Sequence, residues 1–456
     1  MRSADCGVRN ENHPSPRPSP LRGEGEGTRS ASVTLLFRFI VVVAIFTASV
    51  GRAAAEETLV LETLIDEALR GSHEILMTES RWNSARHRIP QAESLPDPMI
   101  MVGYQNEGWR EYTFGKMPDA SWMYSASQMF PFPGKRGLKG EMASRDAEGA
   151  GETYRAARLN TVARVKELYF ELFLAYRDID IILDKMTLFS RIEEAALARY
   201  ASGMAPQQEV LMAQTEKYML TEKEAMLRQK VRSVELMLTS VLGASSSAPM
   251  GRPAEREASA FPYSLDELME TATDRSPEVR SRLRMREAAD AKVRMADKEF
   301  FPDLTLAARV DEKTGPFEDM WSVTATFNIP LYFNTKRSAA AEARSQYRET
   351  IHDLAGVKVM LNSSIQDAWS MMKTSEKLMD IYREGLIPKT SQDFDSALAG
   401  YRAGKVEAIT VINRLKTLLD YETLYWAQFV EREKAIARLE AMTAIAETAV
   451  RNHENN

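Results

Sequence analysis

Hydrophobic residues recur at every third and fourth position along two long stretches of the chain, which is the spacing of a helix that buries one stripe against another helix. The first stripe comprises Leu159, Val162, Val165, Tyr169, Leu172, Tyr176, Ile179 and Leu183, and the second comprises Leu227, Val231, Val234, Leu238 and Val241. No proline lies between Pro133 and Pro206. One helix over 137–200 would therefore reach about 95 Å at 1.5 Å per residue. The pattern predicts long helices that lie side by side as coiled coils.

Four shorter segments alternate between hydrophobic and polar positions with the period of a β-strand. They form two pairs, one within 98–131 and one within 303–330. One face of the second pair carries Leu304, Leu306, Ala308 and Val310, followed by Trp321, Val323, Ala325, Phe327 and Ile329. The matching face of the first pair carries Ile100, Val102 and Tyr104, followed by Trp122, Tyr124, Ala126 and Phe130, with Gln128 as an interruption. Each segment has about nine residues, which is the length of a tilted strand in a membrane β-barrel.

Aromatic residues flank these segments at both ends. Trp122 and Trp321 begin the strands that return from the loops, while Phe130, Tyr332 and Phe333 lie at the opposite end. This distribution is typical of the two aromatic girdles of an outer-membrane barrel, although either pair alone would also suit a soluble half-buried sheet. Four strands cannot close a barrel, and an open edge in hydrocarbon leaves backbone groups unpaired. We therefore expect an oligomer, in which two copies would supply eight strands and three copies twelve.

The chain is built from two tandem repeats. Tyr200 and Gly203 recur as Tyr401 and Gly404 at an offset of 201 residues, and Lys135-Arg136 recurs as Lys336-Arg337 at the same offset. The dipeptide Pro-Asp at 96–97 recurs at 302–303, an offset of 206. We predict a first repeat at 56–242 with a helix–helix turn at 200–206, a linker at 243–263, a second repeat at 264–447 with a turn at 401–406, and a polar tail at 448–456.

An apolar segment precedes the first repeat. Residues 35–50 are predominantly hydrophobic, and Ala53, Ala54 and Ala55 follow as small residues suited to signal-peptide cleavage. We interpret 1–55 as a low-complexity prefix and an export signal. The alternative is an anchoring helix, which the short apolar core disfavours.

Composition narrows the function. The chain has 59 Lys and Arg against 65 Asp and Glu, and this acidic balance argues against a nucleic-acid partner. A single cysteine, Cys6, excludes disulfide scaffolds and cysteine-ligated metal centres. The mean hydropathy of -0.35 argues against a bundle of membrane-spanning helices. His73-Glu74 begins a zinc-peptidase motif, but Met77 occupies the position of the second histidine. We therefore expect neither an enzyme, nor a bound metal, nor a cofactor.

Taken together, these features resemble the TolC family of outer-membrane efflux channels over residues 58–445. The resemblance rests on LETLIDEAL at 61–69, LPDP at 95–98, IPLY at 329–332 with Lys336-Arg337, and the two Tyr-x-x-Gly turns. It implies a mostly α fold with a small membrane β part, in which three copies share a twelve-strand barrel and an α-helical barrel. It also implies a homotrimer in outer-membrane lipid, with most of the chain in the periplasm, that meets a periplasmic adaptor and an inner-membrane pump.

The resemblance assigns roles to the two turns. They would be the periplasmic tips that contact the adaptor, through Tyr200, Gly203, Met204, Tyr401, Gly404 and Lys405. Some family members carry a carboxylate ring six and nine residues after the second tip glycine. Here these positions are Thr410 and Asn413, and Glu407 is the nearest carboxylate, so any gate would be built differently.

The cargo is the least determined part of this interpretation. The LPDP motif resembles the heavy-metal branch of the family, and we take metal ions as the preferred cargo over organic drugs. The 24 methionines would suit soft ions, but such residues also fill irregular packing. Two alternatives remain open, namely the outer-membrane component of type I protein secretion and a periplasmic coiled-coil scaffold or adaptor.

Overall fold

The computed structural model describes residues 58–245 and 250–445, so the export signal predicted at 1–55 and the tail at 448–456 lie outside the described residues. The first repeat contains α2 (Leu61–Gly71), α3 (His73–Glu93), β1 (Met99–Gln105), β2 (Ser121–Phe130), α4 (Lys135–Ala201) and α5 (Gln207–Leu242). The second contains α6 (Leu265–Arg275), α7 (Pro277–Lys298), β3 (Asp303–Glu312), β4 (Met320–Asn328), α8 (Phe333–Asp380), the π-helix η1 (Ile381–Leu386), α9 (Ile387–Arg402) and α10 (Ala408–Thr443). The predicted combination of long helices, four strands and tandem repeats is confirmed.

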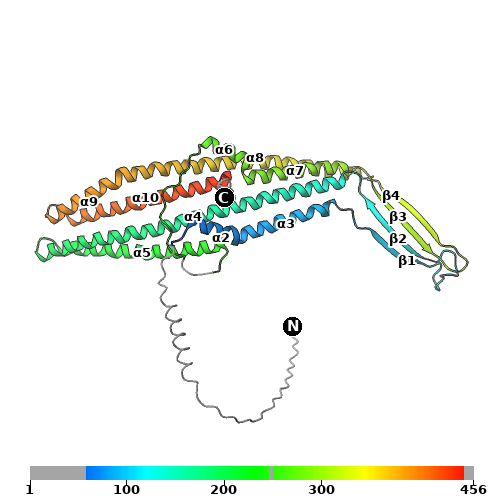
Figure 1. Ribbon diagram of the computed structural model, residues 1–456, viewed down its shortest axis with the longest axis horizontal. Helices are drawn as coiled ribbons and strands as arrows, with labels where there is room; N and C mark the ends of the chain where they lie inside the picture. The colour runs from blue at the N-terminus through cyan, green and yellow to red at the C-terminus, as the bar shows by residue number, and fades with distance from the viewer. Residues whose placement is uncertain (1–57, 246–249, 446–456) are drawn as a thin grey trace, which may run out of the picture. The chain divides into compact units, whose positions relative to one another are not determined.

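The helices lie lengthwise beside one another, and the strands continue from one end of them (Figure 1). α4 runs for 67 residues without a break and packs along α3, α5, α7 and α10. Most of both predicted stripes enters one core, where Leu172 of α4 meets Leu238 of α5. Leu183, the last residue of the first stripe, is exposed instead. A seven-residue repeat drifts by about 20° per heptad on a straight helix, which turns the end of the stripe away from the core.

No helix in the described ranges is both long and apolar enough to cross a membrane.

The long helix of the second repeat is interrupted, unlike α4. The π-helix η1 separates α8 from α9, and Pro388 follows directly as one of the first residues of α9. Proline lacks the N–H that an α-helix interior needs and its ring clashes with the preceding turn. A π-turn widens the helix locally, with the Ile387 N–H bonded to the Tyr382 carbonyl, so the chain passes Pro388 without ending the helical hairpin.

The four strands form one antiparallel sheet in the order β1-β2-β3-β4. Register places residues of the same predicted face opposite one another, as in the row Val102, Tyr124, Val310 and Trp321. We call this side the apolar face. It comprises Ile100, Val102, Tyr104, Trp122, Tyr124, Ala126, Gln128, Phe130, Leu304, Leu306, Ala308, Val310, Trp321, Val323, Ala325 and Phe327. The other side, which we call the polar face, carries mainly Ser, Thr, Asp, Arg and Met.

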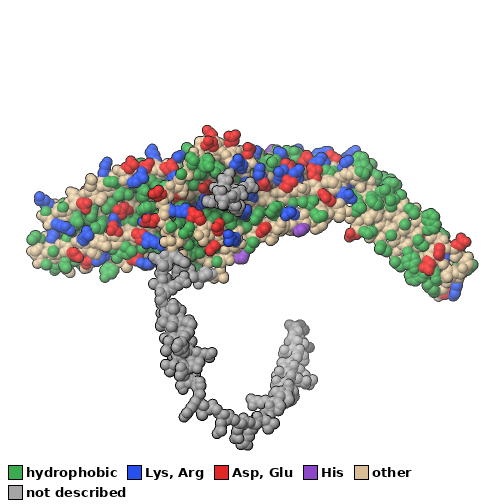
Figure 2. Space-filling view, viewed as in Figure 1, with side chains coloured by type: hydrophobic (Ala, Val, Ile, Leu, Met, Phe, Trp, Pro, Cys, Tyr) green, Lys and Arg blue, Asp and Glu red, His purple; other side chains and the backbone are tan. Residues whose placement is uncertain are grey.

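On the two central strands, β2 and β3, the exposure of the two faces is the reverse of that in a soluble sheet. On β3, Val310 of the apolar face is 47% exposed, whereas the side chain of the adjacent Asp311 on the polar face is only 14% exposed. Hydrophobic side chains accordingly gather over the surface of the strands (Figure 2). No helix of the described ranges covers this side (Figure 1). The hydrophobic face therefore needs an apolar surrounding, which is what lipid supplies to a membrane strand.

A buried ionic contact joins the sheet to the helices. The ammonium of Lys135, at the start of α4, donates to Asp303 Oδ1 at 2.9 Å and to the Phe301 carbonyl at 3.1 Å. The backbone N–H of Phe132 donates to the same Asp303 oxygen at 2.7 Å, and the rings of Phe132 and Phe301 stack with centroids 4.6 Å apart. The end of β2 is therefore fixed to the start of β3 by charge, hydrogen bonding and ring packing together.

Candidate functional site

Both helix–helix turns at the far end of the helices have the same backbone geometry. Gly203 and Gly404 have φ of 73° and 71°, which side-chain-bearing residues rarely adopt. In the first turn, Gly203 N donates to the Tyr200 carbonyl and Met204 N to the Arg199 carbonyl, and the second turn repeats this pair of bonds. This pattern closes a helix C-terminus with a left-handed residue. Glycine is therefore the residue that lets the chain reverse at both turns.

A side-chain network joins the two hairpins near these turns. Tyr401 of α9 donates its hydroxyl to Glu209 Oε2 of α5 at 2.7 Å. Arg199 of α4 donates to the Tyr401 carbonyl at 2.7 Å, and its guanidinium lies over the Tyr401 ring, 4.6 Å from the centroid. We call these three residues the tip latch. Burial, with the hydrogen bond to Glu209, raises the pKa of the Tyr401 hydroxyl, so it remains a donor at neutral pH.

The six residues expected to contact an adaptor do not share one environment. Tyr200 is 45% exposed and Met204 72% exposed, and Gly203, Gly404 and Lys405 are exposed as well. Tyr401 is instead fully buried against its own chain. Its side chain presents no surface to a partner in this conformation, so Tyr401 leaves the set of proposed contact residues. The two tyrosines occupy the same place in the repeat, but Tyr401 meets the facing hairpin and Tyr200 faces outward.

The predicted gate region forms the first turns of α10. Glu407 is exposed and precedes the helix as its N-cap residue, without a side-chain capping bond. Thr410 is half-buried and Asn413 is exposed. These three described residues lie on one short segment but make no side-chain hydrogen bond or ion pair with one another. Sequence reasoning missed the tip latch, although Glu209 stands six residues after Gly203 just as Thr410 stands six residues after Gly404.

The aromatic residues expected at the membrane interfaces lie at both ends of the sheet. At the loop end, Trp122 packs on Tyr104 at 5.3 Å between ring centroids, and Trp321 of the edge strand is exposed. Phe130 is exposed at the other end of β2. Tyr332 and Phe333, which begin α8, are also exposed.

An ionic cluster lies on the polar face, apart from the Lys135–Asp303 pair at its end. Arg309 donates to Asp311 Oδ1 at 2.7 Å and its guanidinium also contacts the sulfur of Met123 on the neighbouring strand. The same face carries Met99, Met101, Met129 and Met320. Charged, hydroxyl and thioether side chains therefore share this face.

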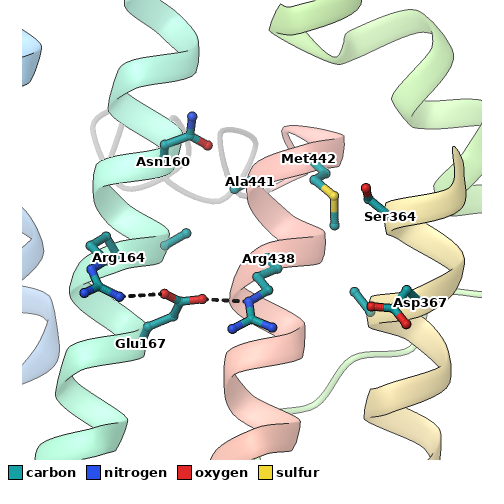
Figure 3. A pocket seen from close by; sticks show the side chains of 10 residues that line it. Asn160, Arg164, Glu167, Ser364, Asp367, Arg438, Ala441 and Met442 are labelled. Carbon is teal, nitrogen blue, oxygen red and sulfur yellow. Dashed lines mark hydrogen bonds and ion pairs between the residues drawn. The ribbon is translucent and has the colours of Figure 1, made fainter. Parts of the chain in front are cut away.

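A surface hollow of about 380 Å³ lies between α4, α8 and α10. In it, Glu167 accepts hydrogen bonds from Arg164 at 3.3 Å and from Arg438 at 2.7 Å, while Asp367 and Ser364 line the opposite wall (Figure 3). The hollow contains no nucleophile beside a base. Among the described residues, no group of three or more His, Cys, Asp or Glu side chains is arranged to hold a metal ion.

Comparison with known proteins gives the family directly. The model of the family described as outer membrane efflux protein matches residues 64–244 and 268–451, and so covers both repeats. The cobalt-zinc-cadmium resistance protein CzcC of Cupriavidus metallidurans is 21% identical over 80% of this chain and 85% of its own length. The nickel-cobalt-cadmium resistance protein NccC of Alcaligenes xylosoxydans xylosoxydans is 24% identical, over 74% of this chain and 75% of its own.

Solved structures agree on the fold. The outer-membrane channel OprN superposes with a TM-score of 0.74 at 15% identity, covering 84% of this chain and 89% of that one. The likeness covers most of the helices and strands. At 15% identity it shows a shared fold and nothing further. With both repeats matched, this chain belongs to the outer membrane efflux protein family, whose members are outer-membrane channels and not enzymes.

Proposed function

We propose that this protein is the homotrimeric exit duct of a tripartite efflux system and that it passes heavy-metal ions to the cell exterior. The observation that carries the proposal is the exposure of the two central strands, β2 and β3, whose apolar face is mostly exposed and whose polar face is sheltered. Such a sheet suits a barrel wall between lipid and water. The long helices on the same chain extend the passage into the periplasm.

The oligomeric state follows from the number of strands. A four-stranded open sheet leaves two edges with unpaired backbone groups, each costing several kcal/mol in hydrocarbon. An eight-strand barrel from two copies would be filled by side chains, whereas twelve strands from three copies leave a lumen. A duct therefore favours three copies, as the family resemblance also implies.

The partners are proposed from the tips. Tyr200, Gly203, Met204, Gly404 and Lys405 form an exposed end at which a periplasmic adaptor could dock, and the adaptor would connect the duct to an inner-membrane pump. The tip latch ties the α4–α5 hairpin to the α9–α10 hairpin within each protomer. We infer that it holds the periplasmic end closed until the adaptor binds, with Glu407, Thr410 and Asn413 near the constriction.

The cargo is inferred from the relatives. CzcC and NccC are named for resistance to cobalt, zinc, cadmium and nickel, and both align over most of their length. A periplasmic scaffold does not fit a member of an outer-membrane channel family. Type I protein secretion and drug export differ from metal export only by partner and cargo, so experiment must separate them.

The test is deletion of the gene, followed by complementation. Loss of tolerance to cobalt, zinc, cadmium or nickel, with rise of the cellular metal content, is the expected result, and the full chain should restore both. Native mass measurement in detergent should give a trimer from the outer membrane. Unchanged metal tolerance, with loss of a secreted protein or of drug tolerance, would instead assign one of the other cargoes. A soluble monomer would overturn the duct itself.

A further inference from the structure

The sheet has two edges that no strand covers within the described part of the chain. β1 and β4 are each paired on one side only, and every residue of β4 is exposed. Three antiparallel steps separate β1 from β4, so the two strands run in opposite directions. β4 of one protomer can therefore lie antiparallel beside β1 of a second copy, as closure of a barrel requires. The contact is then defined by its register, which is the set of β4 residues that lie opposite the β1 residues of the second copy.

The chain contains its own template for this contact, because β2 and β3 join the first repeat to the second. Within that junction, Ala126 lies opposite Ala308 and Phe130 opposite Leu304. Its end is fixed by Asp303, which accepts from Phe132 N and from Lys135. Lys135 is almost completely buried there, with 4% of its side chain exposed.

The sequence offsets between the two repeats relate each residue of the β2–β3 junction to a residue of the edge strands β4 and β1. Trp122 and Pro131 correspond to Trp321 and Pro330, an offset of 199 residues that takes β2 to β4. The Pro-Asp offset of 206 takes β3 back to β1. The pair Ala126–Ala308 then becomes Ala325 opposite Val102 of the next protomer. Both of these residues belong to the apolar face, whereas a slip of one residue would set apolar against polar side chains.

The same offsets assign partners in the next copy to several exposed side chains at the end of the sheet. The stacked pair Phe132–Phe301 becomes Leu331 with Leu95, two hydrophobic residues that are exposed in the single chain, Leu331 at 73%. Asp303 becomes Asp97, which has no hydrogen bond or ion pair to any described residue and is exposed. Lys336 takes the place of Lys135, although two additional residues separate it from the preceding proline.

We propose that the seam between protomers copies the β2–β3 junction, with Ala325 opposite Val102 of the next copy and Asp97 of that copy accepting from Leu331 N and Lys336. The partner is a second copy of this chain, and the inference rests on the proposed closed barrel. Charge complementarity supports it, because Lys336 is 32% exposed and, among the described residues, its ammonium pairs with Glu299 alone. The seam would exclude water from this pair, as the intact junction does for Lys135.

Engineered disulfides test the register. A Cys6→Ser background removes the only native cysteine. Directly opposed strand residues have Cα atoms about 4.5–5.5 Å apart, within the range that a disulfide bridges, whereas diagonal neighbours are about 7–8 Å apart. Ala325→Cys with Val102→Cys should therefore give chains linked into dimers and trimers on a denaturing gel. Ala325→Cys with Ile100→Cys is the shifted control, and Ala126→Cys with Ala308→Cys is the internal control that should link within one chain.

The outcomes separate the register from the assembly. Strong cross-linking of the matched pair and little of the shifted pair supports the seam. Trimers in detergent that cross-link best through the shifted pair overturn the inference and leave the proposed duct standing. Absence of trimers in the Cys6→Ser protein overturns both.

Charge exchange tests the end contact separately. Asp97→Lys and Lys336→Glu should each lower the temperature at which the trimer dissociates, and the double variant should recover most of the loss. Arg337→Glu, beside Lys336 but outside the proposed pair, is the matched control and should not be rescued by Asp97→Lys. A double variant no more stable than either single one would remove the ion pair from the seam.

Discussion

The tip latch offers a sharp test of the proposed closed end, because a single oxygen can be removed from it. In Tyr401→Phe the buried ring remains, and so does the contact of that ring with the Arg199 guanidinium at 4.6 Å. Only the hydrogen bond to Glu209, 2.7 Å long, is lost. A hydrogen bond to a charged group contributes about 1.5–3 kcal/mol. Glu209 is half-buried and regains some hydration, so the lower part of that range applies, about 1.5–2 kcal/mol.

This free energy converts directly into an opening equilibrium. Each 1.4 kcal/mol is a factor of about ten, so the open state of a protomer should gain about 10- to 30-fold in population. Conductance of purified trimers in planar bilayers measures this as a higher open probability. Glu209→Gln keeps an acceptor without charge, so its effect should be smaller.

The matched control is Tyr200→Phe. Tyr200 holds the same place in the first repeat, but its hydroxyl has no hydrogen-bond partner in the described part of the chain. Its removal should leave the conductance at the wild-type level. If Tyr401→Phe also conducts like the wild type, or if Tyr200→Phe opens the duct equally, then the latch does not hold the end closed.

Three further predictions follow from the burial of single side chains and from the face of the sheet on which a residue lies. Ala308→Arg, on the apolar face, should cost about 2–4 kcal/mol per protomer and reduce the yield of outer-membrane trimers, whereas Ala307→Arg on the polar face should be tolerated. Burial raises the pKa of Asp178 to about 6 from its usual 3.8. The free energy of unfolding should therefore fall by up to about 3 kcal/mol as the pH rises from 4 through 6. Thermal unfolding of Asp178→Asn should lack this fall. Lys135→Met should cost about 3 kcal/mol in the same assay, because it leaves the Asp303 carboxylate without its partner.

For each of these three predictions, a specific result would contradict the reasoning. Equal trimer yields for the two arginine variants would mean that the faces are assigned wrongly. The sign for Asp178 follows because the folded chain binds the proton that the unfolded chain has lost between pH 4 and 6. The exposed Asp367→Asn is its control, and a pH dependence that persists in Asp178→Asn would refute the assignment. Lys116→Met, at an exposed ion pair, should cost less than about 1 kcal/mol, and a similar loss in both lysine variants would count against a special role for burial.

Local pattern in the sequence determined the main elements of this protein. Residue spacing is a property of each segment, so the 3- and 4-residue stripes, the alternation of the strands and the tip glycines could be interpreted without knowing their neighbours. The apolar face of all four strands was identified correctly, with Gln128 as an interruption, and the register adds Glu312 at its end, opposite Trp122. The signal segment at 1–55 and the adaptor contacts remain predictions.

Only the tertiary structure decided which residues at matching positions of the two repeats have the same environment. Tyr200 and Tyr401 share the Tyr-x-x-Gly pattern, yet the facing hairpin buries Tyr401 and leaves Tyr200 exposed. Lys135 and Lys336 differ in the same way, since the start of β3 buries the first, with 4% of its side chain exposed, and the second is 32% exposed. Burial depends on what lies across the contact, and those partners are about 200 residues away along the chain. Residue spacing within one segment does not show that pairing, so the latch emerges only when the two repeats are packed together, and the proposed seam needed the observed register of β2 and β3 as its template.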